Sequence, residues 1–515
     1  MKSSRILWAD DEIYLLTPHI MFLTDRGYDV VTVCSGQDAI DSCLSGVFDL
    51  IFLDENMPGL SGLQTLLRIK EISPDTPVVM ITKSEDEGIM EQAIGGKISD
   101  YLTKPVNSSQ ILLCIKKNLD KSRIITQTAA SRYSRQFSLI DSQIGGGGTD
   151  QEWKDIYKTL TYWDLELEDS RTGVSDILHS QKVEANRLFA RFIRDNYFDW
   201  LSNPDTRPVI SPDIFRRAVF PLLDSGERVF FILIDNFRFD QWRAVKDMLS
   251  EHFTPVEDLY YSILPTVTQY SRNSIFSGLM PLEISRHYPD HWVDEDSDEG
   301  KNLSEEFFVG RQLERCGRDV SFSYVKVGGS IQCEKLLNSF DNTDNYRLNV
   351  MVFNFIDMLS HSRTESRVLR ELSSSEAAYR SLTRSWFEHS GIMSLFRRIS
   401  EKGCCVVLTT DHGSILVTNS VKVSGERDTS SSLRYKHGRN MTFNRREVFT
   451  IDSPVNACLP SPSLSSKYII AQNYDFFAFP NNYNQFTQHF TGTFQHGGIS
   501  LEEMLVPLLT LRPKS

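Results

Sequence analysis

Three apolar runs in the C-terminal part of the chain, each long enough for a buried strand, end in aspartate, and two of them add a histidine. Because the carboxyl ends of parallel strands meet at one edge of a sheet, the residues that follow these runs are predicted to gather at one rim. A further histidine comes late in the chain, in a glycine-containing loop before a predicted helix. The candidate residues are Asp235 after VFFILI, Asp357 and His361 after NVMVFNFI, Asp411 and His412 after CCVVLTT, and His496 in FQHGGISLEEM.

These carboxylates and imidazoles cannot share one rim unless cations hold them together. Mixed histidine and aspartate ligation suits zinc, or manganese, better than magnesium. The six groups match three ligands for each of two metal ions. Pairs of ions held about 3.5–4 Å apart serve phosphoryl-transfer enzymes, since one ion activates the nucleophile and the other steadies the leaving oxygen. The pattern therefore predicts two-metal phosphoryl chemistry.

A candidate nucleophile lies between the first and second of these aspartates. The segment SILPTVTQYSRNSIFSG contains Thr266 and Thr268 just ahead of a predicted helix. A hydroxyl at a helix N-terminus that also touches a metal ion is readily deprotonated for attack on phosphorus. We select Thr268, because it lies where the helix should begin.

Basic residues near these motifs could contact a substrate phosphate, because arginine makes forked contacts to phosphate oxygens. Arg272 lies one turn into the helix predicted after Thr268. Three more are close together in the segment YKHGRN: Lys436, His437 and Arg439. A solvated basic loop explains this second group equally well, so both interpretations stay open.

A second set of reactive residue types follows the strands predicted in the first 120 residues. The first strand ends at Asp10 and Asp11, the third at Asp54, the fourth at Thr82 and the fifth at Lys104. Three neighbouring carboxylates require a cation, and hard oxygen ligands in an open geometry suit Mg²⁺. One carboxylate can then attack a phosphoryl group. The lysine can neutralise the added charge, and the threonine hydroxyl can bond a phosphoryl oxygen.

The order of apolar patterns predicts an α/β chain of three segments. Residues 1–122 alternate strand-like and helix-like runs, which indicates a parallel sheet covered by helices on both faces. Residues 123–207 show helical patterns only and are interpreted as a small bundle, packed on itself or on another domain, with a flexible break at Gly145 to Gly148. Residues 208–515 return to alternating strands and helices, as one larger domain.

Composition limits the class of protein. The chain has 68 acidic and 55 basic residues and a formal net charge of −13, which argues against a surface that coats nucleic acid or membrane. We find no helix-turn-helix with clustered basic residues and so expect no DNA-binding domain. No apolar run approaches the ~20 residues of a membrane span. Eight cysteines without a CxxC pair, and no signal-peptide pattern, favour the reducing cytoplasm.

The segments WADDE, FLDENMPGLSG, MITKS and YLTKP resemble the receiver domain of two-component response regulators. The resemblance implies a flavodoxin-like fold, phosphorylation of Asp54 by a sensor histidine kinase and formation of a homodimer on phosphorylation. It also implies that Mg²⁺ is held by Asp10, Asp11 and the Asn56 carbonyl, and that Tyr101 is the aromatic switch residue beside Thr82 and Lys104.

The order of the C-terminal motifs resembles the alkaline phosphatase superfamily. The resemblance implies that Asp235, Asp411 and His412 bind one Zn²⁺ together with Thr268, and that Asp357, His361 and His496 bind a second Zn²⁺. The sulfatase motif Cys-x-Pro-x-Arg is absent, which argues against sulfate esters. More narrowly, the domain looks like a PglZ domain, and the three segments resemble PorX-type response regulators. That likeness implies hydrolysis of cyclic and linear oligonucleotides, a sigma-factor partner and a role in type IX secretion.

Two alternative functions stay open. The same metals and hydroxyl could serve a phosphomonoesterase or a phosphomutase. Alternatively, the PglZ domain is catalytically silent, and phosphorylation only exposes a platform that binds a sigma factor. A complete ligand set argues against the second alternative, because a binding module needs no matched metal ligands.

Overall fold

The computed structural model describes residues 4–74, 76–82, 98–168, 174–293, 302–365, 375–425, 430, 432–461, 463, 465–480 and 483–514, with the side chains of 120–128 and 361–365 left out. The chain divides into two compact units, Met1–Tyr133 and Ser134–Ser515. Among the described helices, none is both long and apolar enough to cross a membrane.

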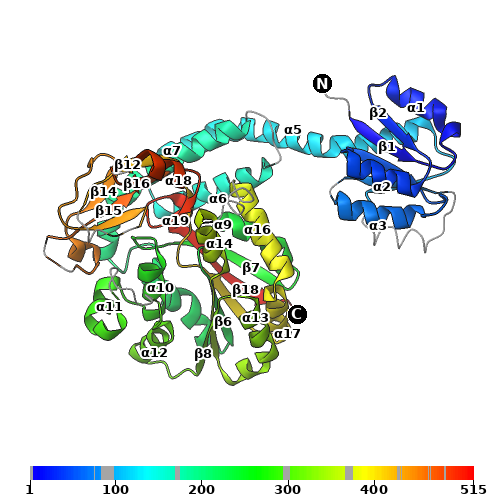
Figure 1. Cartoon of the computed structure of the whole chain (residues 1–515). Helices are drawn as coiled ribbons and strands as arrows, with labels where there is room; N and C mark the ends of the chain where they lie inside the picture. The colour runs from blue at the N-terminus through cyan, green and yellow to red at the C-terminus, as the bar shows by residue number, and fades with distance from the viewer. Residues whose placement is uncertain are drawn as a thin grey trace. The chain divides into compact units, whose positions relative to one another are not determined.

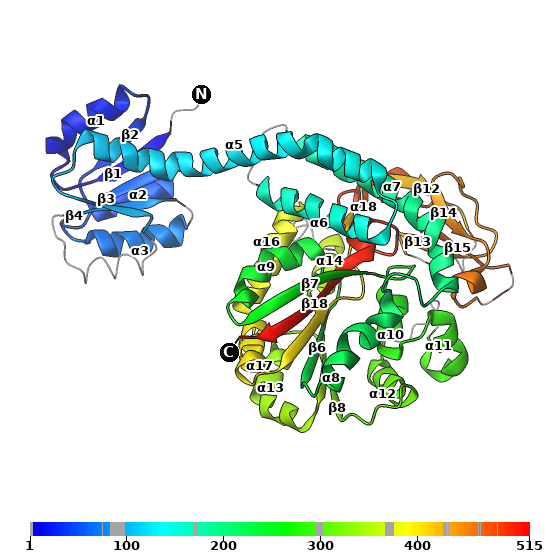
Figure 2. The same cartoon turned by 180° about the vertical axis from the view of Figure 1, so that it is seen from behind.

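The first unit is a five-stranded parallel sheet with helices on both faces (Figure 2). Its elements are β1 (Arg5–Ala9), α1 (Thr17–Thr24), β2 (Asp29–Val33), α2 (Gly36–Ser45), β3 (Leu50–Asp54), α3 (Gly62–Ile72), β4 (Val78–Thr82), β5 (Asp100–Thr103) and the start of α5 (Ser108–Gly146). The strand order is β2-β1-β3-β4-β5. Apolar side chains of α2 and α3 pack on one face, and those of α1 and α5 on the other. The doubly wound α/β fold predicted for this part is thus confirmed.

Helix α5 crosses the segment boundary predicted after residue 122. It spans 39 residues, and the boundary between the two units falls within it. The predicted flexible break is a short connection, because Gly145 and Gly146 still belong to the helix. The next helix, α6 (Asp150–Glu166), begins with a capping box in which Thr149 Oγ1 accepts from the Glu152 backbone N–H and the Glu152 carboxylate accepts from that of Thr149.

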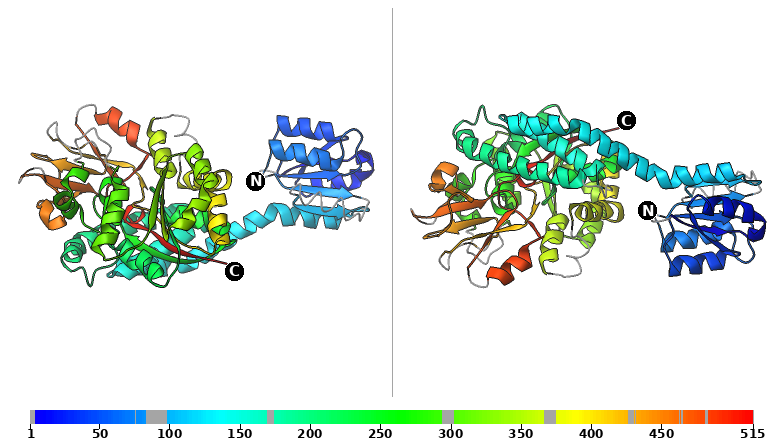
Figure 3. Two further views of the ribbon diagram at one scale, coloured as in Figure 1. Left: turned by 90° about the horizontal axis from the view of Figure 1, so that it is seen from below. Right: turned by 90° about the horizontal axis from the view of Figure 1, so that it is seen from above.

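Helix α6 and the following α7 (Val174–Ser202) pack against the rest of the larger unit as well as against each other (Figure 3). Three polar contacts join α7 to distant parts of the chain: Lys182 Nζ to Glu376 Oε2 at 2.6 Å, Asn186 Nδ2 to Glu502 Oε2 at 3.1 Å and Arg194 NH2 to Gln472 Oε1 at 2.7 Å. The structure thus shows both of the arrangements left open for these helices: they pack on each other and on the neighbouring domain.

A six-stranded mixed sheet forms the centre of the larger unit (Figure 1). Its strands, in spatial order, are β7 (Phe253–Tyr261), β18 (Leu505–Pro513), β10 (Cys405–Thr409), β6 (Val229–Ile234), β9 (Leu348–Phe353) and β8 (Phe322–Val327). The four strands β10, β6, β9 and β8 run parallel, whereas β18 is antiparallel to both of its neighbours. The parallel strands are those that precede most of the predicted metal ligands, so their carboxyl ends create the rim that the sequence predicts.

Helices cover both faces of this sheet. One face packs on α8 (Phe220–Asp224), α10 (Thr268–Ser277) and α12 (Glu305–Arg315) through a continuous apolar cluster. Against the other lie α9 (Phe239–Ser250) and α17 (Ile392–Glu401), with α16 (Glu376–His389) packed on α9. A separate antiparallel sheet contains β13 (Tyr435–Gly438), β15 (Lys467–Ala471) and β14 (Val448–Ile451).

Candidate metal and phosphoryl-transfer sites

An acidic pocket lies at the carboxyl ends of β1 and β3 in the first unit. The Lys104 amino group is 2.8 Å from Asp10 Oδ2 and 2.9 Å from Asp54 Oδ1. Carboxylate oxygens of Asp10, Asp11 and Asp54 all lie within 4.8 Å of one another. Burial raises the pKa of Asp54 above its ordinary value, although Lys104 opposes this effect. Three carboxylates with a single lysine form a hard-oxygen site that suits Mg²⁺.

The other predicted receiver residues differ in how exposed they are. Thr82 is buried at the end of β4, and its carbonyl accepts a hydrogen bond from the Lys104 backbone N–H at 2.8 Å. Asn56 is exposed just after β3, and Tyr101 is 45% exposed on β5. The functional roles of these three residues stay predictions.

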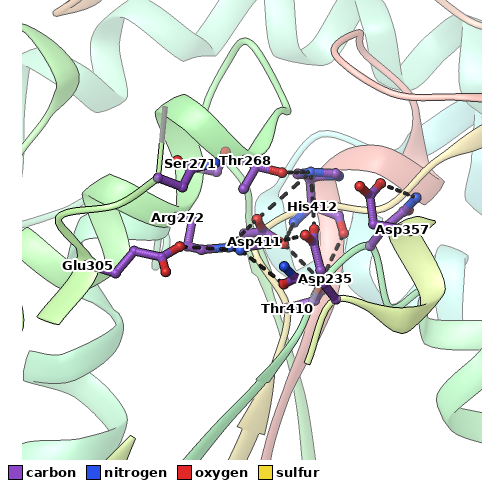
Figure 4. Close-up of polar contacts among 12 residues, drawn as sticks. Asp235, Thr268, Ser271, Arg272, Glu305, Asp357, Thr410, Asp411 and His412 are labelled. Atoms are coloured by element: carbon purple, nitrogen blue, oxygen red, sulfur yellow. Dashed lines mark hydrogen bonds and ion pairs between the residues drawn. The ribbon is translucent and has the colours of Figure 1, made fainter. Parts of the chain in front are cut away.

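Four of the residues predicted in the larger unit come together in one cluster (Figure 4). Asp235 follows β6, and Asp411 and His412 follow the parallel neighbour β10, so all three lie at the same sheet edge. Their ligand atoms lie within 4.8 Å of one another. Thr268 Oγ1 is 3.1 Å from His412 Nε2, which in turn is 3.8 Å from Asp235 Oδ1. The cluster thus combines a hydroxyl with three groups that can ligate a metal.

The structure distinguishes the two threonines considered as nucleophile. Thr268 is the first residue of α10, where unpaired backbone N–H groups favour negative charge. Thr266 is fully buried, and its hydroxyl donates to the Gly498 carbonyl at 2.9 Å and accepts from the Gly497 N–H at 3.0 Å. Thr266 therefore fixes the loop after His496, whereas Thr268 reaches the cluster.

A second pair of predicted ligands lies directly beside the first cluster. His496 Nε2 is 3.8 Å from Asp357 Oδ1, and its ring stacks on His412 with the centroids 4.3 Å apart. Asp357 is in the first turn of α14 (Phe355–Glu365), and the Asn236 amide points to it, with Nδ2 3.3 Å from Oδ1. His361 comes one turn later in α14, and its side chain lies outside the described residues.

The carboxylate and imidazole groups of this cluster are suited to binding metal cations. Asp235 Oδ1 is buried and has no hydrogen-bond partner in the described structure, although it lies within 3.8 Å of His412 Nε2. Burial raises the pKa of Asp235 well above its ordinary value, against the opposing effect of Arg272. A buried carboxylate oxygen that lacks a donor, among imidazole and carboxylate groups, is a typical ligand position for zinc.

Arg272 was considered as a contact for a substrate phosphate, but in the structure its partners are carboxylates. Its guanidinium is 1% exposed, and it pairs with Asp235, with Asp411 at 3.0 Å and with Glu305 at 3.3 Å. Sequence reasoning missed Glu305, because this residue follows no strand and begins a helix of ordinary amphipathic pattern. The arginine thus neutralises carboxylates in this structure.

The YKHGRN segment also differs from its interpretation as a solvated loop. Lys436 and His437 are buried on strand β13, and only Arg439 of the three candidates is exposed. The Lys436 amino group donates to the Ser430 carbonyl at 2.7 Å and lies over the Phe479 ring. Burial and these contacts favour a structural role for Lys436 over contact with a substrate phosphate, and burial alone favours such a role for His437.

Family models match three successive parts of the chain. They describe a response regulator receiver domain at residues 6–116, a PorX response regulator linker domain at 123–201 and a BREX system PglZ alkaline phosphatase-like domain at 214–511.

Relatives and solved structures resemble the N-terminal part. The transcriptional regulatory protein DltR of Streptococcus agalactiae is 30% identical over 121 residues, 24% of this chain and 54% of DltR. ZraR of Salmonella typhimurium is 30% identical over 137 residues, 27% of this chain and 31% of ZraR. The chain therefore spans about half, or less, of the length of these curated relatives. The structure of the chemotaxis response regulator CheY4 of Vibrio cholerae is 26% identical and covers 23% of this chain and 100% of its own, with a TM-score of 0.22.

The acidic pocket on a doubly wound sheet and the receiver match define a response regulator, whose second unit carries an alkaline phosphatase-like domain. The PglZ model covers more than half of the chain, which therefore belongs to the PglZ family. The succession of receiver, linker and PglZ domains is the PorX-type architecture.

Proposed function

We propose that this response regulator is a metal-dependent phosphodiesterase controlled by phosphorylation of Asp54. The observation that carries the proposal is the position of the Thr268 hydroxyl, 3.1 Å from His412 Nε2 at the edge of the carboxylate and imidazole cluster. A hydroxyl at a helix N-terminus next to metal ligands is the arrangement that nucleophilic attack on phosphorus requires.

The ligands would divide between two zinc ions. Asp235, Asp411 and His412 would hold one, and Asp357, His361 and His496 the other. When bound, the ions supply positive charge that favours the ionised hydroxyl and the charged phosphoryl oxygens.

The chain's own residues account for the covalent steps. Thr268 Oγ1 bonds to phosphorus while the bond from phosphorus to the leaving alcohol breaks, and the alcohol takes up the proton that the hydroxyl loses. Water then attacks the phosphorus of this threonyl phosphodiester, which still carries the second ester group. One proton of the water passes to Thr268 Oγ1 as its bond to phosphorus breaks, and a phosphate monoester is released. Each displacement inverts the configuration at phosphorus, so the full cycle retains it.

Metal removal tests this proposal. Purified protein should contain about two zinc ions per chain, as a two-metal site requires. It should hydrolyse a chromogenic phosphodiester, lose that activity on chelation and regain it with zinc. Faster hydrolysis of the matching monoester would instead favour a phosphomonoesterase. Absence of both metal and activity would favour the phosphorylation-controlled binding platform for a sigma factor.

The finer biological role rests on the PorX-type architecture. We propose a cytoplasmic protein with a sensor histidine kinase and a sigma factor as partners, with cyclic and linear oligonucleotides as substrates, in control of type IX secretion. The eight free cysteines are consistent with a reducing compartment. Hydrolysis of short cyclic and linear oligonucleotides by the zinc-loaded chain would test the substrate class. If neither kind of oligonucleotide is hydrolysed, this substrate class is excluded.

Replacement of the acceptor carboxylate tests the receiver. Asp54→Asn should prevent phosphorylation by acetyl phosphate with Mg²⁺, because an amide cannot attack the phosphoryl donor. Intact-mass measurement should show one added phosphoryl group on the unmodified chain and on the exposed control Asp25→Asn, but none on Asp54→Asn. Only the two chains that accept the group should form a homodimer in analytical ultracentrifugation. A phosphoryl group on Asp54→Asn would show that another residue is the acceptor.

A further inference from the structure

One arginine connects three buried carboxylates immediately behind the Thr268 cluster. The nitrogens of Arg272 pair with Asp235, Asp411 and Glu305, and all four side chains are at most 5% exposed. We propose that Arg272 is a positioning residue: a built-in cation that keeps Asp235 and Asp411 oriented for a metal ion and allows the chain to fold before the ion binds. This inference rests on the metal site of the proposed function.

At Asp235, the arginine and a metal ion would use different carboxylate oxygens. Arg272 Nε is 3.0 Å from Asp411 Oδ2, and NH2 pairs with Asp235 Oδ2. Asp235 Oδ1 is left without a hydrogen bond and faces His412 Nε2 at 3.8 Å. Groups behind a ligand commonly fix its orientation and so tune its affinity for the metal. Arg272 can therefore hold Asp235 without displacing the ion, whereas at Asp411 it contacts Oδ2, the oxygen that also lies 3.8 Å from His412 Nε2.

The guanidinium is itself fixed from the side opposite the cluster. Its NH1 is 3.3 Å from Glu305 Oε1 and 3.4 Å from Asn354 Oδ1. Glu305 in turn accepts from the Lys326 amino group at 3.0 Å and from the Tyr324 hydroxyl. Glu305 belongs to α12 and its two partners to β8, elements that contribute no metal ligand, whereas Asn354 follows β9.

The charges explain why an arginine is needed here. When all three are ionised, Asp235, Asp411 and Glu305 bring three negative charges into a buried region, against one positive charge from Arg272 and one from Lys326. Buried charges without partners are costly. If Arg272 is removed, the chain should depend on a bound ion for the missing positive charge.

Thermal unfolding with and without zinc tests the inference. The wild type, Arg272→Gln, Arg272→Lys and Arg380→Gln should be compared after chelation and again with zinc alone. Arg380 is the matched control, because it is also a buried arginine paired with carboxylates, Asp164 and Asp240, away from the predicted ligands. Both glutamine variants should have a lower Tm than wild type in the absence of metal.

The zinc-induced rise in Tm separates positioning from simple structural support. We expect this rise in Arg272→Gln to be about twice that of wild type or more, because the ion replaces the lost charge. Leaving buried carboxylates without a counter-charge costs more than the roughly 10–100-fold of metal affinity that a lost orienting group typically costs. The zinc-induced rise in Tm of Arg380→Gln should equal that of wild type. The rise in Arg272→Lys should also be close to that of wild type, because this variant keeps the charge. Equal rises in all four proteins would overturn the inference. If Arg272→Gln does not fold, Arg272→Lys decides between the two roles. A zinc-induced rise in Tm equal to that of wild type supports the charge role, and a rise about twice as large or more refutes it. Zinc binding by wild type without hydrolysis would refute the proposed function alone.

Discussion

Replacing Thr268 by alanine should lower kcat for a chromogenic phosphodiester on the order of 10⁴-fold or more, as expected when a covalent nucleophile is removed. The physical reason is that Oγ1 is the one atom of this side chain able to bond phosphorus. It lies at the start of α10, 3.1 Å from His412 Nε2. The steady-state rate on the zinc-loaded protein is the measurement.

Two controls make this result specific. Thr268→Ser keeps the hydroxyl at the same helix N-terminus and should retain most of the activity. The zinc content of Thr268→Ala should match that of wild type, because the carboxylate and imidazole ligands remain. Activity in Thr268→Ala above about a tenth of wild type would place the nucleophile elsewhere. The variant should still bind its regulatory partner, so an unaltered response in cells would show that the output is binding rather than hydrolysis.

The strand ends of this protein could be predicted from the sequence because strands buried on both faces consist of consecutive apolar residues. The aspartates that follow β6 and β10 were therefore found, and the structure brings Asp235, Asp411 and His412 within 4.8 Å of one another. The same reasoning located the pocket around Asp54. In both units, the edge of the sheet positions the reactive side chains, and the sequence pattern of each strand shows where that edge is.

Other parts of the site could not be predicted, because they depend on contacts between distant helices. Glu305 reaches Arg272 from α12, and no strand precedes it. A basic residue near a predicted nucleophile suggests a phosphate contact, but only the folded structure shows that carboxylates surround Arg272. The length of α5 could not be predicted for a different reason. The apolar pattern changes at the segment boundary after residue 122, although helix-forming residues continue through it and allow one helix to cross it.

Breaking the buried pair between Arg434 and Glu503 should cost about 3–5 kcal/mol in the free energy of unfolding, because one charge would be left without its partner. Both side chains are 0% exposed, and Arg434 Nε is 3.1 Å from Glu503 Oε1. Glu503 also accepts from the Gly498 N–H at 2.8 Å and from the Ser500 hydroxyl at 2.7 Å. The pair therefore supports the loop that carries His496.

Denaturant titration followed by tryptophan fluorescence would measure this effect, since six of the seven tryptophans lie in the larger unit. Arg434→Met should be strongly destabilised. Arg434→Met combined with Glu503→Gln should recover part of the loss, because glutamine removes the unpaired charge and keeps an acceptor for Gly498. The exposed pair of Arg445 and Asp452 is the matched control, and Arg445→Met should change the free energy by less than about 1 kcal/mol. If Arg434→Met were no less stable than Arg445→Met, the buried pair would not be what holds the His496 loop in place.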